Sequence, residues 1–137
     1  SPLLITANSD GEQIGMSYGS ISPQQLAMQL WPAVHEARID YAEKLASEGA
    51  FTPALKLLLQ VRSVSTSFVV NQRAMQLVNQ IKFQVGEKWA AEGRYRSALR
   101  IFTTVSRSTE DEDLRRRSLE RVTQLRSAYD LARAGSP

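Results

Sequence analysis

Apolar side chains recur along most of this chain at intervals of three or four residues, the period of an amphipathic α-helix. The pattern predicts five helices, over residues 22–48, 52–62, 68–92, 94–107 and 110–134. Residues 1–21 contain frequent Gly and Ser and show no helical period, so we expect a flexible or extended leader there. Residues 135–137 form a short tail. The chain is therefore predicted to be all-α.

Three short sequences fit helix starts, in which a small polar side chain accepts from a free backbone NH and proline fits the first helical position. They are Ser22-Pro23-Gln24-Gln25, Thr52-Pro53 and the capping box Thr109-Glu110-Asp111-Glu112. Gly49 and Gly93 fit helix ends, because glycine readily takes the left-handed conformation that closes a helix. Pro32 interrupts the first predicted helix, so we expect either a kink there or the meeting of two helices.

Each long helix has an apolar stripe that we expect to face inward. The stripe of the first helix consists of Leu26, Leu30, Trp31, Val34, Ala37, Tyr41 and Leu45. The stripe of the 68–92 helix consists of Val70, Ala74, Leu77, Val78, Ile81, Val85 and Trp89. The stripe of the last helix consists of Leu114, Leu119, Val122, Leu125 and Tyr129. The helix over 52–62 is apolar around most of its circumference, so we expect it to be buried on more than one side.

One stretch of the chain occurs twice. Residues 46–61 read ASEGAFTPALKLLLQV and residues 90–105 read AAEGRYRSALRIFTTV, an offset of 44 residues. The same offset maps the stripe of each long helix onto the next, and a fixed period in this range is typical of repeat proteins. We predict antiparallel helical hairpins stacked as an α-solenoid of about two and a half repeats. The units are residues 22–66, residues 67–109 and a capping helix over 110–134.

The motif resembles the tetratricopeptide repeat family. It is carried by small and large residues in the first helices, turns and second helices: Ala42-Leu45, Gly86-Trp89, Gly49-Phe51, Gly93-Tyr95, Ala54-Leu58 and Ala98-Phe102. The resemblance implies close helix packing, in which small residues let backbones meet and large ones fill the gap. The period of 44 exceeds the ~34 residues of the family, which lengthens the first helix of each hairpin. The family's carboxylate-binding groove is not implied, because the corresponding positions hold Ile39, Glu43, Phe83 and Glu87 rather than Lys and Asn.

Charge is unevenly distributed. The chain has 17 Lys and Arg, 14 Asp and Glu, and a formal net charge of +3. Residues 67–110 hold seven basic and three acidic residues, which makes the second repeat the basic one. A field of that sign favours an acidic partner surface, a phosphate backbone or an anionic membrane face.

Two groups of residues are candidate binding sites. The basic group, a candidate site for an acidic protein partner, consists of Arg73, Lys82, Arg96, Arg100 and Arg107. Its alternative is an ordinary solvated face, because charged residues cover the outside of any helix pair. The apolar group, a candidate self-association face, consists of Leu26, Trp31 and Met75. The run Arg115-Arg116-Arg117 is interpreted as structural, because consecutive side chains point in different directions around a helix.

No catalytic motif is apparent in the sequence. His35 is the only histidine and there is no cysteine, so zinc has no set of His and Cys ligands, and disulfides are excluded. We interpret His35 as a surface or half-buried residue. The aromatic residues at repeat-core positions are interpreted as packing: Tyr41, Trp89, Tyr95 and Phe102. We predict no enzymatic activity and no cofactor.

The favoured hypothesis is a protein–protein interaction module or adaptor, because stacked hairpins provide surface rather than a catalytic pocket. The alternatives are a structural subunit that self-associates in a larger assembly and, less favoured, a non-specific nucleic-acid binder. No run of about 18 apolar residues is present, so we expect a soluble domain, cytoplasmic or periplasmic and envelope-associated. The chain begins with Ser1 rather than Met, as a fragment of a longer protein or a processed form would.

Overall fold

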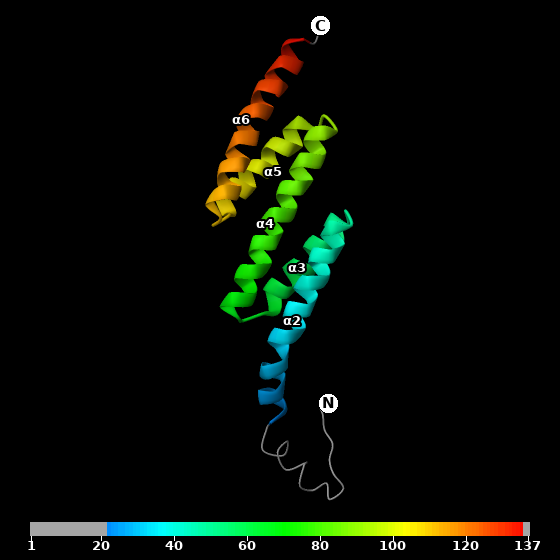
Figure 1. Cartoon of the computed structure of the whole chain (residues 1–137), viewed down its shortest axis with the longest axis vertical. Helices are drawn as coiled ribbons and strands as arrows, with labels where there is room; N and C mark the ends of the chain where they lie inside the picture. The colour runs from blue at the N-terminus through cyan, green and yellow to red at the C-terminus, as the bar shows by residue number, and fades with distance from the viewer. Residues whose placement is uncertain (1–21, 136–137) are drawn as a thin grey trace, which may run out of the picture. The chain divides into compact units, whose positions relative to one another are not determined.

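The computed structural model describes residues 22–135, without the side chains of residues 25–30. These residues form five α-helices and no strand (Figure 1), so the all-α prediction is confirmed. The helices are α2 (Pro23–Ser47), α3 (Phe51–Val64), α4 (Phe68–Ala91), α5 (Tyr95–Ser108) and α6 (Glu112–Ala134). The predicted leader over 1–21 and residues 136–137 of the tail lie outside the described residues. Among the described helices, none has both the length and the apolar character needed to cross a membrane.

The chain divides into two compact units, residues 1–34 and 35–137. Helix α2 begins in the smaller unit and continues through Pro32 as one helix, so the prediction that two helices could meet there is wrong. Proline removes one backbone hydrogen bond from a helix, which weakens α2 at this point. In the smaller unit, the side chains of Trp31 and Val34 are 49% and 37% exposed.

Two helix starts differ from the predicted ones. Asp111 caps α6, and its Oδ1 accepts from the backbone NH groups of Asp113 (2.9 Å) and Leu114 (3.2 Å). The predicted capping box is therefore wrong: Thr109 instead accepts from the NH of Asp111 (3.1 Å), and Asp is the stronger N-cap of the two. Helix α3 begins at Phe51 after Ala50, which makes no side-chain cap, so the predicted start at Thr52-Pro53 is also wrong.

Both predicted glycine stops are confirmed. Gly49 and Gly93 have φ values of 83° and 79°, in the left-handed region that favours glycine. The NH after each glycine returns to the carbonyl five residues earlier, from Ala50 to Leu45 (2.9 Å) and from Arg94 to Trp89 (2.8 Å). These tight turns place the chain in helical conformation one residue later, which explains why α3 starts before its Thr-Pro pair.

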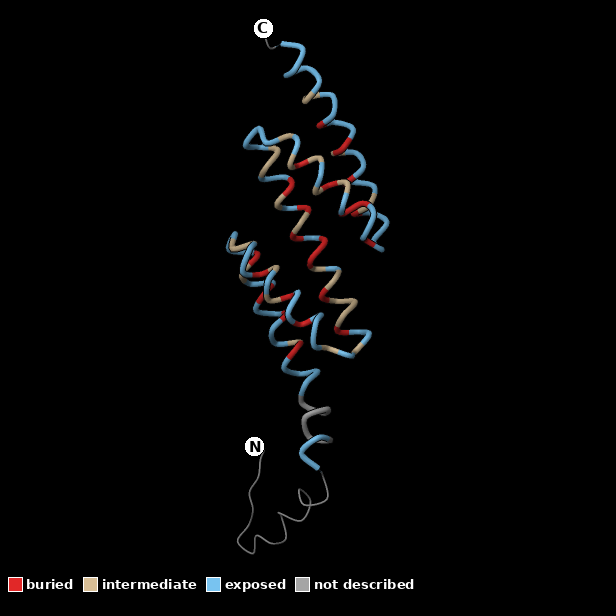
Figure 2. The backbone as a smooth tube through the Cα atoms, turned by 180° about the vertical axis from the view of Figure 1, so that it is seen from behind, coloured by how far each residue is buried: buried red, intermediate tan, exposed pale blue. Residues whose placement is uncertain are grey.

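The larger unit contains two hydrophobic clusters, and α4 contributes to both. The first joins α2, α3 and the first half of α4 around Ile39, Leu58 and Val78. The second joins the second half of α4 with α5 and α6 around Phe83 and Phe102. Figure 2 shows buried positions recurring along the whole of α4. This helix therefore connects the two clusters.

The predicted stripe of α2 is wrong. Val34, Ala37 and Tyr41 are exposed, and the buried face is His35, Ile39, Ala42 and Ala46. His35 is only 4% exposed, which corrects its interpretation as a surface or half-buried residue. In α6, the predicted Leu119 is 51% exposed whereas Ser118 is buried. Close helix contact selects small side chains, which a pattern of large apolar residues misses.

Several positions related by 44 residues are buried alike in α3 and α5. The fully buried residues of α3 and α5 form such pairs: Ala54 with Ala98, Leu58 with Phe102, and Val61 with Val105. The turns before α4 and α6 also correspond. Ser67 accepts from the NH of Val70 as Asp111 does from Leu114, and Ser65 accepts from Ser67 as Thr109 does from Asp111.

Candidate protein-binding face

Helix α5 packs against both α4 and α6 (Figure 1). Its inward face is formed by Ala98, Phe102 and Val105, which are fully buried. Its exposed side bears Arg96, Arg100, Thr104 and Arg107, at spacings of four, four and three residues. These spacings keep the four side chains on one face of the helix. At 1.5 Å per residue they form a ridge about 16 Å long, which we call the α5 ridge.

A shallow hollow lies on each side of the α5 ridge. The hollow against α4 has a volume of about 280 Å³ and is lined by Lys82, Trp89, Ser97, Arg100, Ile101 and Thr104. The hollow against α6 has a volume of about 310 Å³ and is lined by Leu99, Arg100, Thr103, Thr104, Arg107 and Arg126. Arg100 and Thr104 border both. No acidic side chain lines either hollow.

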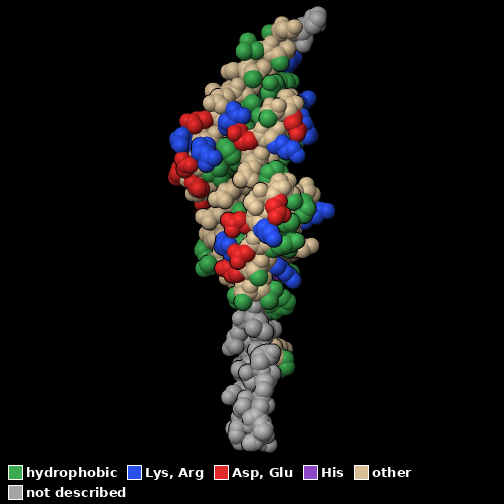
Figure 3. Space-filling model, turned by 45° about the vertical axis from the view of Figure 1, so that its right-hand side comes forward, with side chains coloured by type: hydrophobic (Ala, Val, Ile, Leu, Met, Phe, Trp, Pro, Cys, Tyr) green, Lys and Arg blue, Asp and Glu red, His purple; other side chains and the backbone are tan. Residues whose placement is uncertain are grey.

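Most other arginines of the described chain are neutralised by carboxylates. The arginines in ion pairs are Arg73, Arg94, Arg115, Arg116, Arg117 and Arg121. In the view of Figure 3, basic and acidic side chains accordingly lie close together over much of the described surface. Within residues 22–135, the basic side chains of the two hollows form no such pair. Their uncompensated charge gives this face a positive potential.

Arg73 lies apart from the other predicted basic residues. Its guanidinium donates to Glu36 Oε1 (2.5 Å) and to Asp40 Oδ1 (2.6 Å), and thereby links α4 to α2 within the larger unit. The hydrogen bonds to Asp40 and Glu36 raise the pKa of Arg73. Because its donors are already occupied, we omit Arg73 from the binding face.

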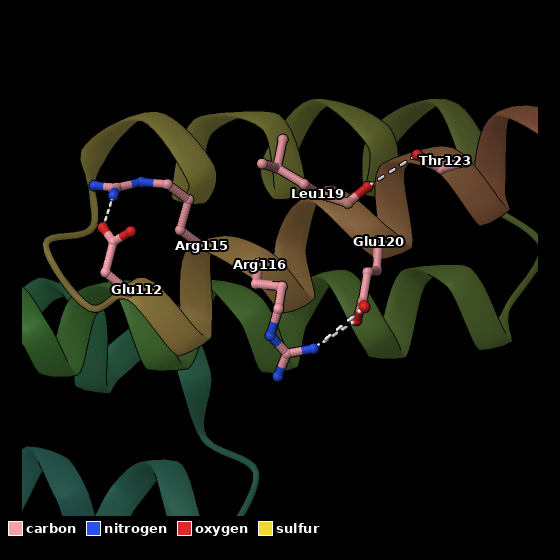
Figure 4. A pocket seen from close by; sticks show the side chains of 6 residues that line it. All are labelled: Glu112, Arg115, Arg116, Leu119, Glu120 and Thr123. Carbon is pink, nitrogen blue, oxygen red and sulfur yellow. Dashed lines mark hydrogen bonds and ion pairs between the residues drawn. The ribbon is translucent and has the colours of Figure 1, made fainter.

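The run Arg115-Arg116-Arg117 is bound within the protein. Figure 4 shows Arg115 directed to Glu112 and Arg116 directed to Glu120, around a hollow that also includes Leu119. Arg116 also donates to Asp113 (2.7 Å), and this hydrogen bond lowers the pKa of Asp113. Arg117 lies over the ring of Phe83, 4.7 Å from its centroid. These contacts support the structural interpretation of the run.

The structure brings four of the five predicted basic residues to the α5 face and adds one that the sequence analysis missed. Lys82, Arg96, Arg100 and Arg107 lie on the ridge or in its hollows, where Arg126 of α6 joins them. The repeat could have indicated Arg126, because it stands 44 residues after Lys82.

The three predicted self-association residues differ in exposure and in the unit to which they belong. Trp31 is half-exposed in the smaller unit, Met75 is partly buried on α4, and the side chain of Leu26 lies outside the described residues. No three His, Asp or Glu side chains among the described residues are arranged to hold a metal ion.

Comparison with protein-family models, curated proteins and solved structures found no match to this chain.

Proposed function

We propose that this chain is a TPR-like helical-repeat module that binds a protein partner, with the α5 ridge as the contact surface. The observation that carries the proposal is the separation of its arginines into two populations. Most of those elsewhere are held by carboxylates, the exceptions being Arg38, Arg62 and Arg133, whereas none of those on the α5 ridge and in its hollows forms an ion pair within the described residues. An exposed positive face of this kind attracts an acidic surface and speeds its association.

The correspondence of positions 44 residues apart supports the solenoid interpretation. Equivalent residues of α3 and α5 are fully buried, and the turns that precede α4 and α6 use corresponding hydrogen bonds. In repeat proteins, stacking of such units creates an extended surface rather than an enclosed pocket. The two open hollows beside α5 fit recognition of a protein surface better than enclosure of a small molecule, which supports a binding role without catalysis or a cofactor.

The test is partner capture from nuclease-treated lysate with the immobilised chain, followed by mass spectrometry. An Arg96→Glu/Arg100→Glu variant reverses two charges of the α5 ridge. The matched control, Lys44→Glu/Lys88→Glu, makes the same change in net charge at exposed lysines of α2 and α4. We expect a discrete protein to be retained by the parent and the control and lost from the ridge variant. Equal retention by all three would refute the α5 ridge as the contact surface.

A structural subunit that self-associates is the second candidate. It is favoured by the exposure of large apolar side chains, among them Trp31 (49%), Phe68 (73%) and Val69 (69%). Light scattering over a range of concentrations tests it. A monomer at high concentration would contradict self-association, whereas a stable oligomer that captures no other protein would favour it over the adaptor.

A further inference from the structure

A basic residue recurs at a corresponding position of every described helix. Lys82 of α4 and Arg100 of α5 line one hollow, and Arg100 shares the next with Arg126 of α6. The positions 44 residues before Lys82 and Arg100 are Arg38 of α2 and Lys56 of α3. We call the five residues the basic ladder: Arg38, Lys56, Lys82, Arg100 and Arg126. Their spacing alternates between 18 and 26 residues.

The buried neighbours of Lys56 and Arg100 give these two side chains the same direction relative to the core. Lys56 stands midway between Ala54 and Leu58, and Arg100 stands midway between Ala98 and Phe102. All four neighbours are fully buried, so both basic side chains leave the helix on its exposed side.

Two of the three first-helix members also correspond: Arg38 directly precedes buried Ile39, as Lys82 precedes buried Phe83. Arg126 differs, because it follows buried Leu125 and precedes exposed Ser127. Arg38 and Arg126 are exposed, and Lys82 is partly exposed. The ladder positions of the first hairpin therefore match those of the second, although only the latter line hollows described above.

The charge of the ladder is uncompensated. None of its five residues takes part in an ion pair among those found in the described chain. Helices α3 and α5 contain no Asp or Glu, and no acidic residue occurs between Glu48 and Glu87. The chain thus presents cations at regular intervals without local carboxylates on the second helices.

We propose that the basic ladder binds one extended acidic polypeptide segment that crosses the helices. This inference rests on the proposed function and specifies its partner. Packed helices lie about 8–10 Å apart, so five positions span roughly 32–40 Å. An extended chain advances about 3.3 Å per residue, so a segment of roughly 10–12 residues with a carboxylate near every third position matches the ladder.

An acidic polypeptide fits the ladder better than a nucleic acid does. Single-stranded nucleic acids are bound by basic grooves combined with aromatic side chains on which the bases stack. Trp89 is the aromatic residue of the two hollows, and it is partly buried within the second hydrophobic cluster. The residues that line the two hollows therefore include no row of aromatic side chains beside the cations.

The test measures fluorescence anisotropy of labelled peptides with the full chain. The probes are a 12-residue and a 6-residue peptide of repeated Glu-Glu-Ser, an uncharged Gln-Gln-Ser 12-mer, and a 12-nucleotide oligothymidylate. Each exposed ion pair contributes little to the binding free energy. The additional ion pairs that the 12-residue acidic peptide can form are together expected to make its affinity about tenfold higher than that of the 6-residue peptide. The uncharged peptide should not bind.

An Arg38→Glu/Lys56→Glu variant is expected to abolish the advantage of the longer peptide, because it removes the first hairpin's share of the ladder. The Arg38→Gln/Lys56→Gln variant should lose less of this affinity advantage, and the Lys44→Glu/Lys88→Glu control should keep it. Circular dichroism establishes that each variant is folded. Equal affinity for both peptide lengths, an unaffected Arg38→Glu/Lys56→Glu variant, or equally tight binding of oligothymidylate would each overturn the ladder. In that case, loss of a captured protein partner from the Arg96→Glu/Arg100→Glu variant would show that the proposed function of the α5 ridge stands without the basic ladder.

Discussion

The contact between Gly86 and Phe102 is the most sharply testable feature of the second hydrophobic cluster. A Cβ atom at Gly86 would lie 2.8 Å from Cζ of Phe102 and 2.9 Å from Cγ2 of Ile101. The Phe102 ring is fully buried and meets Phe83 edge-to-face, with centroids 5.1 Å apart, so it has little room to withdraw. At the positions 44 residues earlier stand Ala42 and Leu58, which are both fully buried in the first hydrophobic cluster.

The Gly86→Ala substitution should destabilise the protein although alanine is the better helix former. Replacing glycine in a helix interior gains about 1 kcal/mol. Overpacking a buried site costs typically ~1–3 kcal/mol, so the net loss is about 1 kcal/mol. Phe102→Leu alone should cost about 1–2 kcal/mol, a fraction of a Phe→Ala loss, because it leaves a gap beside Gly86.

The double substitution Gly86→Ala/Phe102→Leu reproduces the pair of the first hairpin and should relieve both defects. We expect its loss of unfolding free energy to be smaller than the sum of the single losses by about 1–2 kcal/mol, a typical coupling for residues in contact. Urea denaturation followed by circular dichroism measures this cycle. The reciprocal exchange, Ala42→Gly/Leu58→Phe, is the control and should show coupling of the same sign. If the losses of the two single variants sum to that of the double variant within about 0.5 kcal/mol, the two positions are not coupled and the reasoning is refuted.

Three further predictions follow from the helix ends and their charges. Gly93→Ala should lower the unfolding free energy by about 1–2 kcal/mol in urea denaturation, because its φ of 79° strains an L-residue although nothing obstructs the methyl group. Asp111→Ala removes the N-cap of α6 and should lower the unfolding free energy by about 1 kcal/mol. An unchanged midpoint of urea denaturation would contradict the role of Asp111 as a cap. Carboxyl NMR titration should give Asp113 a pKa below its ordinary value, because Arg116 donates a hydrogen bond to it, and Arg116→Gln should raise that pKa. A lowered folded-state pKa stabilises the protein above the unfolded pKa, and this contribution is lost as the pH falls through the folded pKa.

The helices and their glycine stops could be predicted from the sequence because their causes are local. The period of three to four residues is set by helix geometry. The stops at Gly49 and Gly93 depend on conformations that glycine alone takes readily. The burial of Ala98 and Phe102 follows from the spacing within their own helix. Such features need no knowledge of distant residues.

Other features depended on contacts that no local pattern records. The buried face of α2 contains His35 and Ala42, and Ala42 belongs to a cluster that α2 forms with α3 and α4, whereas a count of large apolar residues selects Tyr41 instead. Arg73 is removed from the candidate site by Asp40, which stands 33 residues away in the sequence. Arg126 joins the site through the packing of α6 on α5.

The two corresponding turns have a consequence for how such a chain can grow. Ser65 and Thr109, 44 residues apart, each accept from the backbone NH two residues later, and each turn leads into a capped helix. A gene segment copied between these two points would therefore join ends that already carry matching acceptors and donors. Tandem duplication could lengthen the array by whole hairpins without a new junction, and each copy would bring its own Lys82 and Arg100. The length of the proposed binding surface for an acidic chain is thus a quantity that evolution, or a protein engineer, can adjust in fixed increments.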